Sequence, residues 1–74
     1  YATPRALEAE ELPDLVQRYA FAAEIARATG FTGVQVHAAH GYLLSSFLSP
    51  ASNRRTDDWG GSVANRARLL IDII

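Results

Sequence analysis

The stretch from Val34 to Tyr42 reads Val-Gln-Val-His-Ala-Ala-His-Gly-Tyr and decides the fold class. Its first four residues combine β-branched and polar side chains in alternation, which is typical of a short strand. The strand then ends at residues 38–41, Ala-Ala-His-Gly. The sequence therefore predicts one strand at residues 34–37, with imidazole and phenol side chains gathered where it ends.

A helix is expected on each side of this strand. Upstream, apolar residues recur every three or four positions, and Pro13 fits only near the first turn of a helix. Gly30 is a typical helix stop. The expected buried stripe is Leu12, Leu15, Val16, Tyr19, Ala22, Ala23 and Ala26.

Downstream, residues 42–48 predict a short helical turn closed by Pro50, and residues 51–61 predict a polar loop. Ser62 is a good N-cap for a closing helix. The expected buried residues of that helix are Val63, Ala67, Leu70, Ile71 and Ile74.

The order helix, strand, long loop, helix predicts the α/β class with a parallel sheet. One strand cannot form a sheet, because its backbone donors and acceptors need neighbouring strands. The chain of 74 residues also contains no methionine and ends on residues 69–74, apolar apart from Asp72, in a helical pattern. We therefore expect residues 1–74 to be a partial domain, incomplete at both ends.

Composition excludes several classes of protein. Hydrophobic residues make up 49% of the chain, too many for intrinsic disorder, and the absence of cysteine excludes disulfides and thiolate metal sites. A formal net charge of -1 gives no electrostatic case for binding nucleic acid or an anionic membrane. No apolar run is long enough for a membrane span and no signal peptide opens the chain, so we expect a cytoplasmic protein.

His37, His40 and Tyr42 are the candidate catalytic and substrate-binding residues. In parallel α/β folds, active sites form at the carboxyl ends of the strands. Each residue has an ordinary structural alternative, and two histidines three positions apart also suggest zinc. The zinc hypothesis is weak, because the nearest carboxylates, at residues 57–58, lie in a distant loop. Three hydrogen-bond donors flanked by small residues favour a functional site.

Six motifs in order cover nearly the whole chain. They are Pro4–Leu7, Gly30–Leu44, Phe47–Pro50, Asn53–Asp57, Gly60–Ser62 and Asn65–Arg68. In this order they together resemble the old yellow enzyme family of flavin oxidoreductases. Two departures are Gln35, where many relatives have glutamate, and Trp59, where tyrosine is more usual.

The resemblance implies a segment of a (β/α)8 TIM barrel around its fourth strand. It implies FMN as the bound cofactor, NADPH or NADH as the reductant, and an activated alkene, such as an α,β-unsaturated carbonyl or nitro compound, as the small-molecule substrate. By motif position, His37 and His40 resemble the pair that binds the substrate oxygen, and Tyr42 resembles the proton donor. Many relatives carry asparagine in place of His40. The residues that bind the FMN phosphate are expected outside this chain.

Two alternatives remain open at this stage. The full-length protein could instead resemble dienoyl-CoA reductases or amine dehydrogenases, which share the barrel, and a substrate screen would separate these. The isolated 74-residue chain could also be an inactive fragment or an interaction module. The resemblance leaves open whether the full-length protein is a monomer or a homo-oligomer.

The polar loop has a structural and a functional interpretation. The run Asn53–Asp58 could bind an anion, but we expect its arginines and aspartates to pair with one another and to hold the loop. Gly60–Ser62 before a helix resembles a phosphate-binding turn, yet the lysine and spacing of a nucleotide loop are absent. We assign it no phosphate.

Overall fold

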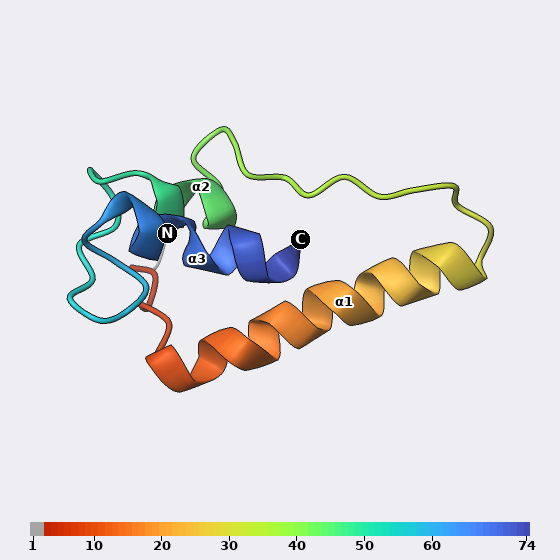
Figure 1. The fold of residues 1–74 in the computed structure, drawn as a ribbon, viewed down its shortest axis with the longest axis horizontal. Coiled ribbons are helices and arrows are strands. Elements are labelled where there is room, and N and C mark those ends of the chain that lie inside the picture. The colour runs from red at the N-terminus through yellow and green to blue at the C-terminus, as the bar shows by residue number, and fades with distance from the viewer. Residues whose placement is uncertain (1–2) are drawn as a thin grey trace.

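The computed structural model describes residues 3–74, which form three α-helices and one 3-10 turn (Figure 1). The 3-10 turn η1 spans Ala9–Glu11 and leads directly into α1, Leu12–Ala28. A long irregular segment then returns alongside α1 to α2, Leu43–Leu48. After a polar loop, α3 spans Val63–Ile73. Within residues 3–74 no helix has the length and apolar character needed to cross a membrane.

Both ends of α1 form where the sequence predicts. Pro13 lies in the first turn, where its missing N–H costs no helical hydrogen bond. At the other end Gly30 adopts a φ of 99°. The Phe31 amide donates to the Ala26 carbonyl (3.0 Å) and the Gly30 amide to the Arg27 carbonyl (3.2 Å), the pair of bonds of a Schellman motif. The predicted Ser62 cap is also confirmed, because its side chain accepts from the Asn65 amide.

The strand predicted at residues 34–37 is not formed. No strand occurs among residues 3–74, and residues 32–38 make no backbone–backbone hydrogen bond there. The physical reason is that a strand exists only as part of a ladder, and no second extended segment lies beside this one. The alternation of a strand is partly kept, since Val36 and Ala38 pack against the core while His37 and Ala39 are exposed.

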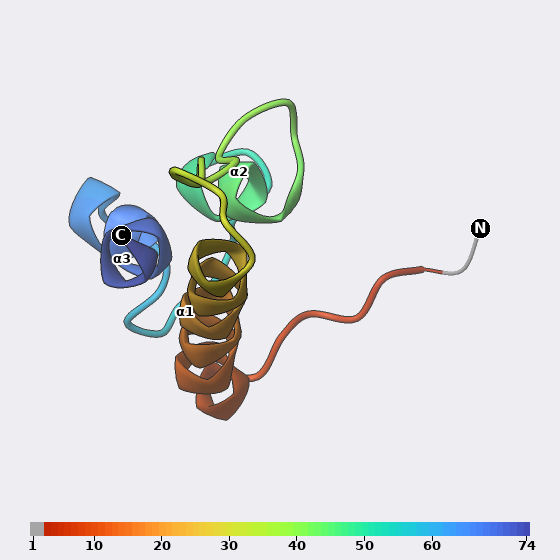
Figure 2. The ribbon, with the colours of Figure 1, turned by 90° about the vertical axis from the view of Figure 1, so that its right-hand side faces the viewer.

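A small apolar core joins the three helices. Leu12, Leu44 and Leu69, from α1, α2 and α3, are all but inaccessible to solvent, and Phe47 of α2 is buried beside them. Viewed end-on, α3 lies next to both α1 and α2 (Figure 2), and it packs against both. Of the stripe predicted on α1, Leu12, Leu15, Val16 and Tyr19 belong to this core. Ala22 is exposed, and Ala23 and Ala26 are half-buried outside the core.

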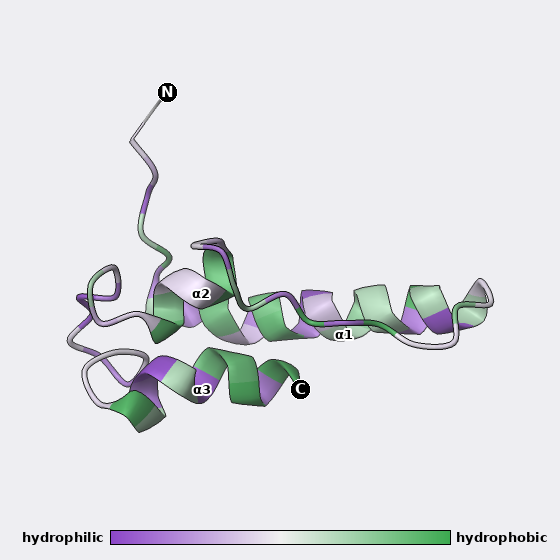
Figure 3. Cartoon of the chain, turned by 90° about the horizontal axis from the view of Figure 1, so that it is seen from above, coloured by the Kyte–Doolittle hydropathy of each residue, from purple (hydrophilic) through white to green (hydrophobic). Residues whose placement is uncertain are grey.

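The predicted buried face of α3 is largely wrong. Leu69 is the fully buried residue, and Leu70 and Ile73 pack around it. Val63, Ile71 and Ile74 are instead exposed at 71%, 66% and 83%. Apolar residues occupy most of the C-terminal half of α3 (Figure 3), so the helical period alone does not select the side that meets α1 and α2.

Asn53 is the buried polar centre of the loop between α2 and α3. Its Nδ2 donates to the carbonyls of Phe47 (2.6 Å) and Trp59 (2.9 Å), and its Oδ1 accepts from the Arg55 amide (3.0 Å). Gly60 packs so closely here that a Cβ would lie 2.5 Å from the Arg55 carbonyl oxygen. The amide therefore ties the end of α2 to the chain that enters α3.

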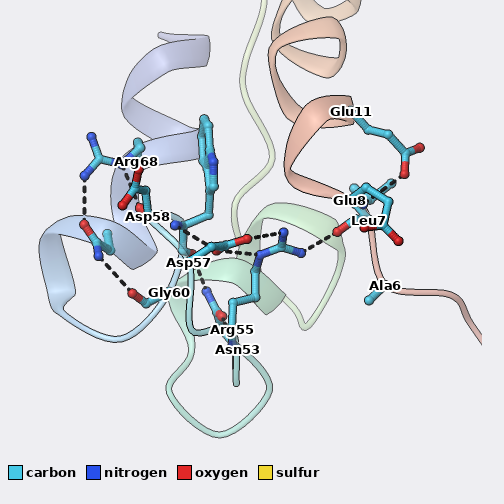
Figure 4. Close-up of polar contacts among 12 residues, drawn as sticks. Ala6, Leu7, Glu8, Glu11, Asn53, Arg55, Asp57, Asp58, Gly60 and Arg68 are labelled. Carbon is cyan, nitrogen blue, oxygen red and sulfur yellow. Dashed lines mark hydrogen bonds and ion pairs between the residues drawn. The ribbon is translucent and has the colours of Figure 1, made fainter.

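Arg55 ties the same loop to the beginning of the chain. Its guanidinium donates to Asp57 through Nε (3.1 Å) and Nη2 (2.6 Å), and to the Leu7 carbonyl through Nη1 (2.6 Å) (Figure 4). The hydrogen bonds from Arg55 hold the pKa of the Asp57 carboxyl below its ordinary value. The predicted pairing of loop arginines with aspartates is thus confirmed for Arg55 and Asp57.

We predict that Asn53→Ala lowers the free energy of unfolding of the protein carrying this chain by about 1–3 kcal/mol, because two carbonyls and one amide lose a buried partner. Chemical denaturation measures the change. Arg54→Ala is the matched control: its side chain is exposed, so the expected change is within about 0.5 kcal/mol. Equal stability of the Asn53→Ala variant and the wild type would contradict the assigned role.

A second prediction concerns Glu11, whose carboxylate accepts from Arg5 Nη1 (2.6 Å) and Nη2 (3.0 Å) and from the Glu8 amide (2.9 Å). The hydrogen bonds from Arg5 lower its pKa from 4.5 to about 2. A lowered pKa means that this carboxylate stabilises the fold above pH 4.5 and that the contribution is lost as the pH falls towards 2.

A carboxyl-selective NMR titration should give the low pKa of Glu11 directly. Arg5→Gln should return it towards the ordinary value, whereas Arg18→Gln, which breaks a separate exposed pair with Asp14, should leave it unchanged. A Glu11 pKa that is the same in the wild type and Arg5→Gln would disprove the pairing.

Candidate active site

His37, His40 and Tyr42 lie together, as the sequence predicts. The His37 ring makes an edge-to-face contact with each of the other two rings. Its centroid lies 5.3 Å from that of His40, at an interplanar angle of 89°, and 5.4 Å from that of Tyr42, at 84°. All three residues are exposed. The structure therefore presents two imidazoles and a phenol at one accessible place, between the irregular segment and α2.

A tight left-handed turn brings these rings together. His40 and Gly41 have φ values of 61° and 78°, and the Tyr42 amide closes the turn by donating to the Ala39 carbonyl (3.3 Å). Positive φ at both central residues is the type I′ pattern. Space does not restrict position 41, because a Cβ on Gly41 would meet nothing within 4 Å. The positive φ is what favours glycine there, since residues with a side chain rarely adopt it.

The backbone fixes the tautomer of His37. The Ala39 amide donates to His37 Nδ1 (3.2 Å). An imidazole nitrogen that accepts a hydrogen bond carries no proton, so the neutral ring has its proton on Nε2. His37 is thereby a donor through Nε2 without needing a positive charge.

The two histidines also line a hollow. It has a volume of about 490 Å³ and is bounded by residues 35–40. Tyr42 is not part of this lining, and its exposed fraction is 65%. The phenol therefore belongs to this site through its ring contact with His37 and not through the lining of the hollow.

Among residues 3–74, no three side chains of histidine, cysteine, aspartate or glutamate lie close enough together to hold a metal ion.

Ser45 is a residue of this region that the sequence motifs do not identify. Ser45 lies in the first turn of α2, and its Oγ accepts from the Gly41 amide (3.2 Å). Its position four residues after Gly41 is the only sequence signal for this contact, and serines in such short helices are common. The contact becomes visible only once the left-handed turn is known.

Comparison with known proteins places the chain in one family. A sequence profile described as the NADH:flavin oxidoreductase / NADH oxidase family matches residues 1–74. The chain is 50% identical over 74 residues to a "probable flavin mononucleotide-dependent alkene reductase" of Leishmania infantum, matching 100% of this chain and 20% of that protein.

Solved structures agree with this assignment. Morphinone reductase in complex with tetrahydroNAD matches with a TM-score of 0.95 and 49% identity, over 97% of this chain and 20% of that one. The old yellow enzyme homologue from Zymomonas mobilis matches with a TM-score of 0.95 and 48% identity, over 99% and 21%. The chain spans about a fifth of the length of each of these three proteins. It belongs to the NADH:flavin oxidoreductase / NADH oxidase family, the family of old yellow enzyme.

Proposed function

We propose that this chain is the substrate-binding segment of an FMN-dependent reductase of activated alkenes. The observation that carries the proposal is the contact of the His37 ring with both His40 and Tyr42. It brings two oxygen-binding donors and a proton donor to one exposed place. The names of the relatives, an alkene reductase and morphinone reductase, support the same chemistry.

His37 and His40 are proposed to bind the electron-withdrawing oxygen of the substrate. During reduction of a conjugated carbonyl or nitro compound, negative charge builds on that oxygen. Donors already in place stabilise this charge more in the transition state than in the ground state. The Ala39 amide supports this role, because it leaves the His37 proton on Nε2.

Tyr42 is proposed to donate a proton to the α-carbon of the substrate alkene. A phenol is protonated at neutral pH and can act as a general acid. Tyr42 is exposed, and its ring contacts the ring of His37, which also lines the hollow. This arrangement lets one molecule contact the imidazole donors and the phenol together.

The donors of this chain fit the substrate side of a flavin site, because their ring N–H and phenol groups are exposed together. When bound, FMN supplies the hydride, after its own reduction by NADH or NADPH. We place the residues that hold FMN in parts of the protein beyond this chain.

The whole protein is proposed to be a (β/α)8 barrel. Residues 29–42 return alongside α1, as a strand does beside the preceding helix of an α/β unit (Figure 1). The unpaired backbone of residues 32–38 is suited to neighbouring strands on both sides. His37 would then lie at the carboxyl end of a strand, where barrel active sites form.

In the full-length enzyme, Tyr42→Phe should slow reduction of the alkene by about 10²-fold or more and leave reduction of the flavin by NADH nearly unchanged. Stopped-flow absorbance of the flavin follows the two half-reactions separately. Tyr19→Phe is the matched control, since that residue is half-buried on α1 and contributes to the core. Equal slowing of both half-reactions by Tyr42→Phe would remove the proton-donor role.

Replacing His37 or His40 with alanine should weaken the binding of a simple phenol, whose oxygen mimics an enolate, by about 10²-fold. Titration of the flavin absorbance with the phenol gives the affinity. His40→Asn keeps an N–H donor at the same position and should largely retain binding. Phenol affinity that is unchanged in both alanine variants would reject the oxygen-binding role.

A further inference from the structure

His40 occupies a backbone conformation that its side chain disfavours. Its φ of 61° lies in the left-handed region, where the Cβ of an L-residue crowds the following carbonyl oxygen. Such a residue needs support from its surroundings to stay in place. The hydrogen bond that closes the turn joins the Tyr42 amide to the Ala39 carbonyl. The amide of Gly41 takes no part in that bond.

Ser45 supplies that support. Its Oγ lies 3.2 Å from the Gly41 nitrogen and accepts its proton. The acceptor sits on a well-anchored helix, because its neighbours on α2, Leu44 and Phe47, are 1% and 8% exposed in the core. The hydroxyl therefore connects the strained turn to the most buried part of the molecule.

We propose that Ser45 is a positioning residue of the active site. By holding the Gly41 amide, it keeps His40 left-handed and so keeps the His40 ring against His37. It touches neither substrate nor cofactor, and it acts through His40. This inference rests on the proposed function, since it assumes that His40 binds the substrate oxygen.

Ser46 provides a matched control on the same helix. It is also a half-buried serine, but its Oγ donates to the Leu43 carbonyl (2.6 Å) and stays within α2. Loss of its hydroxyl removes a bond from the helix without touching the turn. Alanine is a better helix former than serine, so Ser45→Ala and Ser46→Ala should both retain α2.

The test measures phenol affinity in the full-length, FMN-loaded enzyme. Ser45→Ala should weaken phenol binding by about tenfold, since a displaced donor binds its oxygen poorly. Ser45→Thr, which keeps the hydroxyl, should restore affinity, and Ser46→Ala should leave it unchanged. The rate of flavin reduction by NADH should be the same in all of them. Wild-type affinity in Ser45→Ala, or equal losses in Ser45→Ala and Ser46→Ala, would overturn the proposal.

A double variant distinguishes positioning from a general structural effect. If Ser45 acts through His40, Ser45→Ala should add no further loss of phenol affinity to His40→Ala. Additive losses would show that Ser45 acts independently and would overturn the proposal. The His40→Ala variant alone separates the two hypotheses. If it binds phenol normally, the proposed oxygen-binding role of His40 fails. A loss in His40→Ala together with normal binding in Ser45→Ala rejects only the role of Ser45.

Discussion

The buried amide of Asn53 is the interaction on which the arrangement of the chain most depends. A hydrophobic core of only four buried side chains has little directional preference, because apolar contacts accept many orientations. The three hydrogen bonds of Asn53 are directional, and they join the end of α2 to Trp59 and Arg55. They fix where the loop runs and therefore where α3 begins. Since α2 also carries Ser45, the same amide indirectly places the turn that holds the histidines.

Sequence alone predicts the features of this fold that depend on neighbouring residues. The Gly30 stop and the Ser62 cap are local, because each satisfies backbone groups within a few residues. The strand at residues 34–37 could not be realised in the same way, because its partners must come from elsewhere in a protein. The buried side of α3 was also beyond prediction. Its C-terminal half is apolar apart from Asp72, and the positions of α1 and α2, rather than any periodicity, bury Leu69 and expose Ile71.

In the candidate site, too, some features can be predicted from the sequence and others cannot. The grouping of His37, His40 and Tyr42 is predictable, since three rings within six residues at a bend cannot lie far apart. Their orientation is not, because it follows from two positive φ angles and from the amide that donates to His37 Nδ1. Glycine at position 41 is compatible with many turns, and histidine at position 40 gives little indication of a left-handed backbone. The residue types therefore indicate the chemistry of the site, whereas the backbone conformation sets the orientation of its rings.

The hydrogen bond from Arg55 to the Leu7 carbonyl has a consequence for the order of folding. It joins residues 48 positions apart, whereas the bonds of Asn53 span six or fewer. Closing a long loop costs more chain entropy than closing a short one, and the cost is met before the contact forms. We expect α2 and its following loop to assemble first as a local unit. The Arg55 guanidinium would then be held in place by Asp57, and its hydrogen bond to the Leu7 carbonyl would form last.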